Sequence, residues 1–161
     1  MSVLQELPIR SWSVAAFVLR PEGDSWRVLL MRRTGSPPMG GWWCQIAGRI
    51  EPGEAAWQAA VREIREEAGL EVERLYSADR CEMFYDPVEE CLSVSPVFVA
   101  IVEPDRPVVL NDEHSQYVWL TAAEALERLP FPAQRDILRH IDADFVRHAP
   151  SELLRIDTGS V

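Results

Sequence analysis

Lysine is absent from this sequence: all 16 basic residues are arginines, against 26 aspartates and glutamates. The resulting formal net charge of −10 argues against general binding to nucleic-acid polymers and to anionic membranes, because both carry negative charge. The same charge repels free phosphate compounds. A phosphate-bearing substrate would therefore need metal ions and a few local arginines to offset the field.

Long apolar runs are also missing. No stretch approaches the roughly 20 residues that a membrane-spanning helix needs, and residues 1–10 lack the basic start and apolar run of a signal peptide. The three cysteines, Cys44, Cys81 and Cys91, form no C-x-x-C pair, so we expect a reduced, cytoplasmic protein. With no repeat and no linker, the chain is expected to form a single domain over residues 1–161.

The most informative stretch runs from Gly48 to Leu70, where Glu63, Glu66 and Glu67 stand at helical i, i+3 and i+4 spacing. Apolar residues recur on the opposite side, which predicts a helix that is apolar inward and acidic outward. Its apolar residues are Trp57, Ala60, Val61, Ile64 and Ala68. Pro52-Gly53 predicts a turn before the helix, and Gly69 a left-handed residue at its end.

Three carboxylates on one helical face repel each other, and Arg62 and Arg65 relieve this only in part. Clustered carboxylate oxygens suit Mg²⁺ or Mn²⁺, which bridge proteins to substrate phosphates. The alternative is an ordinary solvated acidic face.

The spacing of the whole stretch favours a metal site over an ordinary solvated face. It reads Gly48, five residues, Glu54, seven residues, Arg62-Glu63-Ile64, one residue, Glu66-Glu67, one residue, Gly69-Leu70. This pattern resembles the signature of the Nudix hydrolases at every fixed position. The resemblance implies an α/β fold: a mixed sheet between helices in an α/β/α sandwich, with the signature as loop–helix–loop. It also implies Mg²⁺- or Mn²⁺-dependent hydrolysis of a phosphoanhydride bond.

The resemblance also implies roles for individual residues. Metal ligands would be the carbonyl of Ala47 and the carboxylates of Glu63, Glu66 and Glu67, with Glu113 reaching the metals from outside the signature. The resemblance does not assign the general base, because this residue varies among Nudix enzymes. We expect Glu66 to take that role, with a base outside the signature as the alternative, and we place Glu63 and Arg62 also at the catalytic centre. Gly48, Glu54 and Gly69 would be structural, with Glu54 and Arg62 pairing to hold the loop against the helix.

Candidate substrate contacts lie elsewhere in the chain. Arg32 and Arg33 end a predicted strand and could hold phosphates, because guanidinium groups bind phosphate bidentately; the alternative is a solvated strand end. Trp43 or Tyr85 could stack on a flat heterocycle, and the alternative for Trp43 is core packing. His114 is interpreted as a hydrogen-bonding residue in a loop.

Periodicity outlines the rest of the chain. Expected strands cover residues 11–19, 26–32, 42–47, 72–84, 91–102 and 116–120. Cys81 and Cys91 would be buried thiols facing each other across a hairpin. Thr121 and Glu124 predict a capping box for one helix, and a last helix is expected over residues 133–147. Residues 149–161 show no period and are expected to form a loose tail.

The Glu113-His114 pair before Tyr117-x-Trp119 resembles Nudix enzymes acting on dihydroneopterin triphosphate or on dinucleoside tetraphosphates. We expect a compact triphosphate, a nucleoside triphosphate or dihydroneopterin triphosphate, cut to monophosphate and pyrophosphate. Dinucleoside polyphosphates, nucleotide sugars and non-catalytic nucleotide sensing remain alternatives. The expected partner is this small molecule alone, with the protein a monomer or homodimer.

Overall fold

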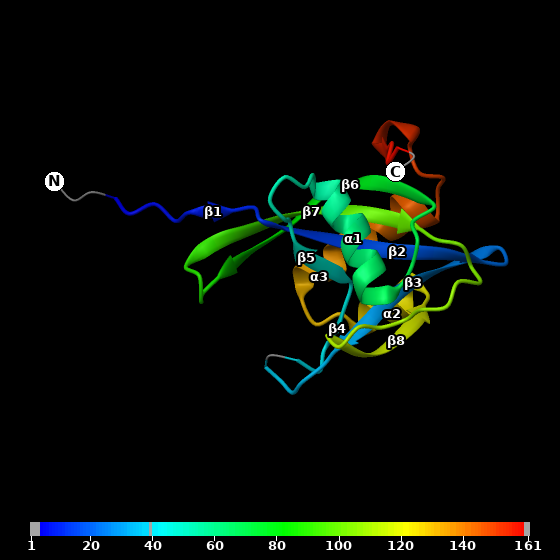
Figure 1. Ribbon diagram of the computed structural model, residues 1–161, viewed down its shortest axis with the longest axis horizontal. Coiled ribbons are helices and arrows are strands. Elements are labelled where there is room, and N and C mark those ends of the chain that lie inside the picture. Colours follow the sequence, from blue (N-terminus) through cyan, green and yellow to red (C-terminus); the bar gives the residue numbers. More distant parts are fainter. Residues whose placement is uncertain (1–3, 39, 160–161) are drawn as a thin grey trace.

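The computed structural model describes residues 4–38 and 40–159, and in it a mixed β-sheet lies between helices. Helix α1, Ala56–Ala68, crosses one face of the sheet, while α2, Ala122–Arg128, and α3, Pro132–Ile141, cover the other (Figure 1). This arrangement confirms the predicted α/β class and the position of the signature as loop–helix–loop.

The sheet has nine strands, and its main path runs β4-β3-β2-β7-β6-β9. Strand β1 pairs with β7, β5 with β2, and β8 with β3. Strands β2 and β7 are parallel, as are β1 and β7, while the other pairings are antiparallel. The strands are β1 Ile9–Arg10, β2 Ser13–Glu22, β3 Ser25–Arg33, β4 Trp43–Cys44, β5 Ile46–Arg49, β6 Arg74–Asp86, β7 Cys91–Ile101, β8 His114–Leu120 and β9 Arg155–Ile156.

Strand β2 organises this sheet because it changes partner along its length. Its first four residues, Ser13 to Ala16, pair with β5, whereas Leu19 to Glu22 pair with β3. On its other edge, Ala15 to Leu19 run parallel to β7. The chain thus brings β5, which leads into α1, against the centre of the sheet.

Two hydrophobic cores follow from the alternation of side chains along β2. Ala15, Phe17 and Leu19 point toward α2 and α3, where Ile137, Leu138, Ile141 and Phe145 complete one core. Val14, Ala16 and Val18 point toward α1 and meet Ala60, Ile64 and Ala68 in the other. The predicted apolar stripes of both helices therefore face the sheet.

The predicted capping box of α2 is confirmed. Thr121 Oγ1 accepts a hydrogen bond from the Glu124 backbone N–H at 3.3 Å, and Glu124 accepts one from the Thr121 backbone N–H at 2.9 Å. The predicted last helix is too long, because α3 ends at Ile141 and a π-helical turn, Asp142–Val146, follows it.

Two further expectations are wrong. The tail is not loose: residues Glu152–Leu154 form a 3₁₀ turn, and in β9 Arg155 and Ile156 pair with Tyr76 and Leu75 of β6. Cys81 is exposed and lies opposite Pro96, whereas Cys91 is buried opposite Asp86. The hairpin turn pairs Asp86 with Cys91, so Cys81, five residues before Asp86, lies opposite Pro96 and the two thiols do not face each other.

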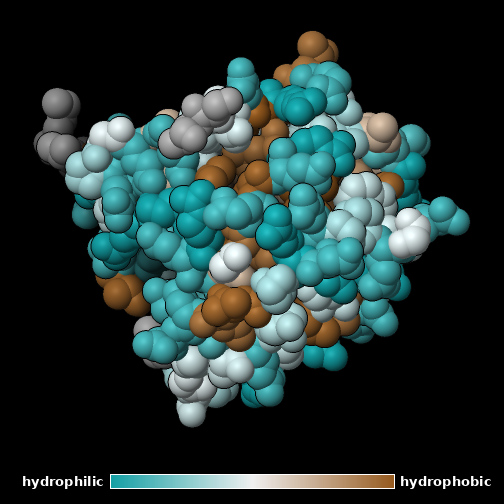
Figure 2. All heavy atoms as spheres, turned by 45° about the vertical axis from the view of Figure 1, so that its right-hand side comes forward, coloured by the Kyte–Doolittle hydropathy of each residue, from teal (hydrophilic) through white to brown (hydrophobic). Residues whose placement is uncertain are grey.

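Within the described ranges, no helix combines the length and apolar character needed to cross a membrane. The face shown in Figure 2 is mainly hydrophilic and is interrupted by apolar patches.

Candidate active site around helix α1

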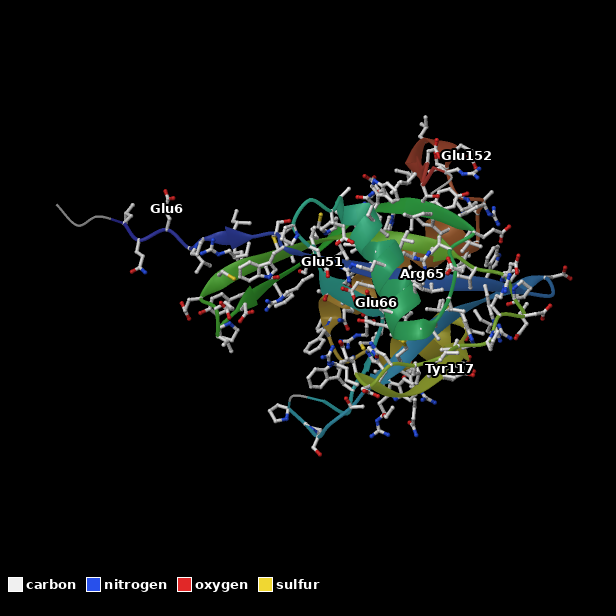
Figure 3. All side chains as sticks on the ribbon, viewed as in Figure 1. Glu6, Glu51, Arg65, Glu66, Tyr117 and Glu152 are labelled. Carbon is white, nitrogen blue, oxygen red and sulfur yellow. The ribbon has the colours of Figure 1, made fainter. Side chains whose placement is uncertain are left out.

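Helix α1 follows the predicted turn, in which Gly53 has φ of 80°, and ends at Gly69, which adopts φ of 66° in the left-handed region. The Gly69 N–H donates to the Arg65 carbonyl at 2.9 Å, as expected for a left-handed C-cap. Figure 3 shows Glu66 and Arg65 projecting from different sides of this helix. Both helix ends are therefore set by the residues that the sequence indicated.

Glu67 departs from the predicted acidic outward face. Its side chain is buried, with 2% of its surface exposed, and its Oε2 atom has no hydrogen-bond partner. The pKa of Glu67 is raised to about 8, first by burial and then by the negative charges of Glu63 and Glu113, while the Ala47 backbone and Arg33 act in the opposite direction. An unpartnered buried carboxylate is costly, so this position favours a proton or a cation.

Gly48 makes room for Glu63. A Cβ atom at position 48 would lie 2.0 Å from the Glu63 Cδ atom, so a side chain there would displace the carboxyl group. Burial raises the pKa of Glu63, and its contacts with Arg62 lower it. The first glycine of the signature therefore allows the β5 backbone to lie against the Glu63 carboxyl group.

Arg62 ties the loop to the helix. Its Nε and Nη2 atoms donate to Glu54 at 2.8 and 3.0 Å, and Nη2 also donates to the Arg49 carbonyl at 2.8 Å. Its Nη1 atom donates to Glu63 at 2.7 Å and to Glu66 at 3.2 Å. The bonds to Arg62 hold the pKa of Glu54 below its usual value. The predicted Glu54–Arg62 pair is present, and Arg62 also orients two candidate ligands.

Glu113 and His114 stand where the chain enters β8. Glu113 is exposed, its carbonyl accepts hydrogen bonds from Thr34, and its charge acts on both Glu63 and Glu67. His114 is not in a loop: it begins β8, is buried, and lies 3.8 Å from the Cys44 sulfur through Nε2. Burial lowers the pKa of His114 and raises that of Cys44 to about 12, which keeps both groups neutral near pH 7.

These side chains fit a hard divalent cation by their chemistry. Carboxylates and a backbone carbonyl are the ligands that Mg²⁺ and Mn²⁺ prefer, and the free Oε2 atom of Glu67 is a buried acceptor that such an ion would satisfy. Among the described residues, no three acidic, histidine or cysteine side chains are already gathered at metal-binding spacing. Binding would therefore draw the carboxylates together, against their hydrogen bonds to Arg62.

The candidate substrate contacts are only partly brought to this site. The positive charge of Arg33 lowers the pKa of Glu67. Arg32 instead donates hydrogen bonds to the Gly41 carbonyl at 3.0 Å and to Gln116 at 3.4 Å. Trp43 packs against the α2–α3 core, and the Arg128 guanidinium lies 5.1 Å from its ring centroid. These contacts favour the alternative for Trp43, core packing, over stacking on a substrate.

Tyr85 lies away from the carboxylates. It stands opposite Leu92, five residues along β7 from Val97, which pairs with Ala15 in the centre of the sheet. At about 3.4 Å per residue this is roughly 17 Å. Tyr85 instead donates a hydrogen bond to Glu90 at 2.5 Å within the same hairpin, so the structure does not bring it to the site.

The structure assembles a second polar group that the sequence did not indicate. Glu82 of β6 accepts hydrogen bonds from Gln45 and Gln134, which lie 37 and 52 residues away in the chain. The two glutamines are buried. Neutral amides with no common spacing carry no sequence signal, so only the tertiary fold shows this cluster.

The comparisons with known proteins agree with the geometry of α1 and its loop. The NUDIX domain model matches residues 10–141. This chain belongs to the Nudix family. The prediction of a Nudix-type hydrolase domain is therefore confirmed at the level of the family.

Two curated relatives illustrate the range of proteins that carry this Nudix domain. An octanoyltransferase of Myxococcus xanthus is 39% identical over 140 residues, which cover 84% of this chain and 37% of that protein. An asymmetrical bis(5′-nucleosyl)-tetraphosphatase of Caenorhabditis elegans is 31% identical over 103 residues, covering 63% of this chain and 74% of that protein. Because the chain spans little more than a third of the first relative, the activity named there does not carry over.

Solved structures share this Nudix fold. A C. elegans Ap4A hydrolase in a binary complex superposes with a TM-score of 0.69 at 25% identity, covering 81% of this chain and 94% of that one. The E. coli dihydroneopterin triphosphate pyrophosphohydrolase gives 0.67 at 24% identity, covering 83% and 96%. At 24% identity, the likeness to the E. coli enzyme shows the fold alone.

Proposed function

We propose that this Nudix domain hydrolyses a phosphoanhydride bond in a small nucleotide-like molecule, with Mg²⁺ or Mn²⁺ held by Glu63, Glu66, Glu67, Glu113 and the Ala47 carbonyl. The observation that carries the proposal is the buried, unpartnered carboxylate oxygen of Glu67 beside two further carboxylates. When bound, the metal would neutralise phosphate charge and polarise the phosphoryl oxygens.

We assign separate roles in this reaction to individual residues of the chain. Glu66 is mostly exposed, and we assign it the acceptance of the proton from the attacking water. Arg62 holds Glu63 and Glu66 in place by its two Nη1 hydrogen bonds. Arg33, next to the carboxylates, offers a fork for a substrate phosphate. The protein thus supplies positioning and charge, which dominate phosphoryl transfer.

The substrate that we favour is a compact triphosphate, a nucleoside triphosphate or dihydroneopterin triphosphate, cut to monophosphate and pyrophosphate. The Glu113-His114 pair and the Tyr117-x-Trp119 strand support this choice. A dinucleoside polyphosphate is the second candidate, because a relative with 31% identity is named for that reaction. We place the reaction in the cytoplasm, with no partner other than the substrate or a second copy of the chain.

One experiment separates these candidates. The protein is incubated with Mg²⁺ in ¹⁸O-water and a panel of triphosphates, dinucleoside polyphosphates and nucleotide sugars, and kcat/KM and label position are compared. A triphosphate as best substrate, giving monophosphate and pyrophosphate, supports the proposal. A preference of more than about tenfold for a dinucleotide, about 1.4 kcal/mol in transition-state binding, rejects it. Binding of metal and nucleotide without any cleavage would instead identify a sensor.

A further inference from the structure

The group formed by Gln45, Glu82 and Gln134 lies apart from the carboxylates of α1. Gln45 Nε2 donates to Glu82 Oε2 at 3.0 Å, and Gln134 Nε2 donates to Glu82 Oε1 at 3.3 Å. The Oε1 atoms of both glutamines are buried and have no hydrogen-bond partner. Each such orphaned acceptor costs free energy until a donor reaches it.

When it is ionised, the Glu82 carboxylate sets the orientation of both amides; burial raises its pKa, and the hydrogen bonds from Gln134 and Gln45 lower it. A carboxylate only accepts hydrogen bonds, so each amide must turn its NH₂ group toward Glu82 and leave its oxygen free. The group therefore presents acceptors only: the remaining lone pairs of Glu82 and two amide oxygens. Its complement is a ligand edge that consists of adjacent donors. A phosphate or another carboxylate has no such edge.

The cluster lies on the face of the sheet opposite α1. Glu82 stands opposite Ser95, which lies two residues from Val97 of the α2–α3 core, and alternation puts Ser95 on the same face as Val97. Gln45 precedes Ile46, which points into the α1 core, so Gln45 points the other way. Gln134 comes from α3 itself.

This position suits the end of a substrate that is remote from its phosphates. Gln45 is two residues from Ala47, about 7 Å along an extended chain, and Ala47 is exposed. Glu82 is only partly buried. Phe131, three residues before Gln134, is 48% exposed and packs edge-on against Trp42, three residues before Gln45, at 6.3 Å between ring centroids. The donor groups of a flat ring bound there would meet the acceptors of the cluster, and the ring would lie beside an aromatic surface.

We propose that Gln45, Glu82 and Gln134 bind the donor edge of a 2-amino-4-oxo heterocycle, the ring N–H and adjacent NH₂ group that guanine and pterins share. The two donors match the two oxygens of Glu82, as in other bidentate pairs with a carboxylate. The terminal torsion of each glutamine has broad wells, so a small rotation brings its oxygen to the NH₂ group. This inference names the substrate class of the proposed function and rests on it for its biological role.

Adenine and hypoxanthine fit the cluster less well. Adenine places a ring acceptor beside its single NH₂ group, so it would set two acceptors against each other. Hypoxanthine keeps the ring N–H and lacks the NH₂ group. A site built to accept a donor discriminates strongly against an analogue that lacks it, because buried acceptors then stay unpaired.

The first test uses the unaltered protein and free nucleosides without metal, so that it is independent of hydrolysis. Binding of guanosine, inosine, adenosine and 7,8-dihydroneopterin is measured by ligand-detected NMR. We expect guanosine or dihydroneopterin to bind at least about tenfold more tightly than inosine, and adenosine more weakly still. Equal affinities, a preference for adenosine, or no binding would each overturn the inference. The ratio of the affinities for guanosine and dihydroneopterin shows whether the site prefers the donor edge of a guanine or that of a pterin.

The second test substitutes the cluster. Glu82→Gln should reduce the preference for guanosine over inosine toward unity, whereas Glu127→Gln, an exposed glutamate of α2, should leave it unchanged. Gln134→Met removes one acceptor without changing charge and should lower the preference in part, which covers the case in which Glu82→Gln fails to fold. An unchanged preference in a folded variant of either kind overturns the inference. A protein that binds guanosine selectively but cleaves nothing would contradict the proposed function and leave this site intact.

Discussion

Glu67 occupies an unusual position for a carboxylate, because it is buried, lacks a partner at one oxygen and lies among negative charges. The i, i+3, i+4 rule correctly placed it with Glu63 and Glu66. The same rule also places Glu67 beside Ile64, three residues earlier, and Ala60, seven residues earlier, both of which are buried. The helical spacing therefore predicts the burial of Glu67. The pKa of Glu67 also depends on neighbours from β3, β5 and the loop before β8, which the spacing does not indicate.

Glu67 gives the metal-free protein a defined pH dependence of stability. Its folded pKa of about 8 exceeds the ordinary 4.5, so between these values the folded state holds a proton that the unfolded chain releases. Stability therefore falls as pH rises through this window, by roughly 3–5 kcal/mol in total. Glu67→Gln should remove most of this fall, measured by urea unfolding in EDTA from pH 5 to pH 8.5. Glu127→Gln is the control, and parallel curves for all three proteins would refute the prediction.

Gly48 should tolerate no side chain. Gly48→Ala would place a methyl group 2.0 Å from the Glu63 carboxyl carbon, and we expect a loss of about 1–3 kcal/mol in unfolding free energy together with weaker metal binding. The double variant Gly48→Ala/Glu63→Ala should recover stability but not metal binding, because the obstructing carboxyl group is gone. Denaturant unfolding and Mn²⁺ titration measure both effects. A single variant as stable as the parent protein would contradict this account.

Glu113 should affect metal binding more than chemistry. It lies outside the signature, and its charge acts on both Glu63 and Glu67. Glu113→Ala should lower hydrolysis severalfold at limiting Mg²⁺ and much less at saturating Mg²⁺, whereas the neighbouring exposed Asp112→Ala should behave like the parent. The measurement is the Mg²⁺ dependence of the rate. An unaltered Mg²⁺ requirement would return Glu113 to an ordinary loop residue.

At the scale of elements, Arg62 connects α1 with the loop that precedes it. It contacts Glu54 through two nitrogens in a partly buried setting, and it also bonds to the Arg49 carbonyl. Arg62→Lys keeps the charge but loses the planar fork, so we expect a loss of about 1–3 kcal/mol in stability and weaker metal binding.

Arg65→Lys provides the matched control for this element. Arg65 also makes two bonds to a glutamate, Glu71, but both side chains are largely exposed. Exposed pairs contribute about 0–1 kcal/mol, so this variant should remain close to the parent in thermal and denaturant unfolding. Equal losses for the two variants would show that Arg62 has no special role in holding the loop.

Most elements were predictable from the sequence, and those that were not share a physical reason. Helix α1 is recognisable because one face is buried, and β7 because the continuous apolar run in its second half is buried on both faces of the sheet. Strand β9 has two residues, too few for any period, and forms only because β6 offers an unpaired edge. The misplacement of Cys81 follows from the position of the hairpin turn, which pairs Asp86 with Cys91 and therefore Cys81 with Pro96.

At the scale of the whole molecule, the net charge opposes the binding of a phosphate substrate at the proposed site. A net charge of −10 repels a polyphosphate, and the site itself adds further carboxylates. We therefore expect turnover to require cations at the point where phosphate binds, helped by local arginines such as Arg33. The family, the sheet and the signature helix could be predicted from the sequence. The Gln45–Glu82–Gln134 cluster could not, because it joins three separate elements.

The most direct test of the central claim is the Mg²⁺ dependence of phosphoanhydride hydrolysis by the parent protein, Glu67→Gln and Glu127→Gln, with the fold of each checked by thermal melting. We predict that the parent and Glu127→Gln require Mg²⁺ or Mn²⁺ and stop on chelation, while folded Glu67→Gln loses at least about a hundredfold in rate at every Mg²⁺ concentration. Hydrolysis that survives thorough chelation, or a folded Glu67→Gln with the parent's activity, would contradict the assignment of these carboxylates as the metal site.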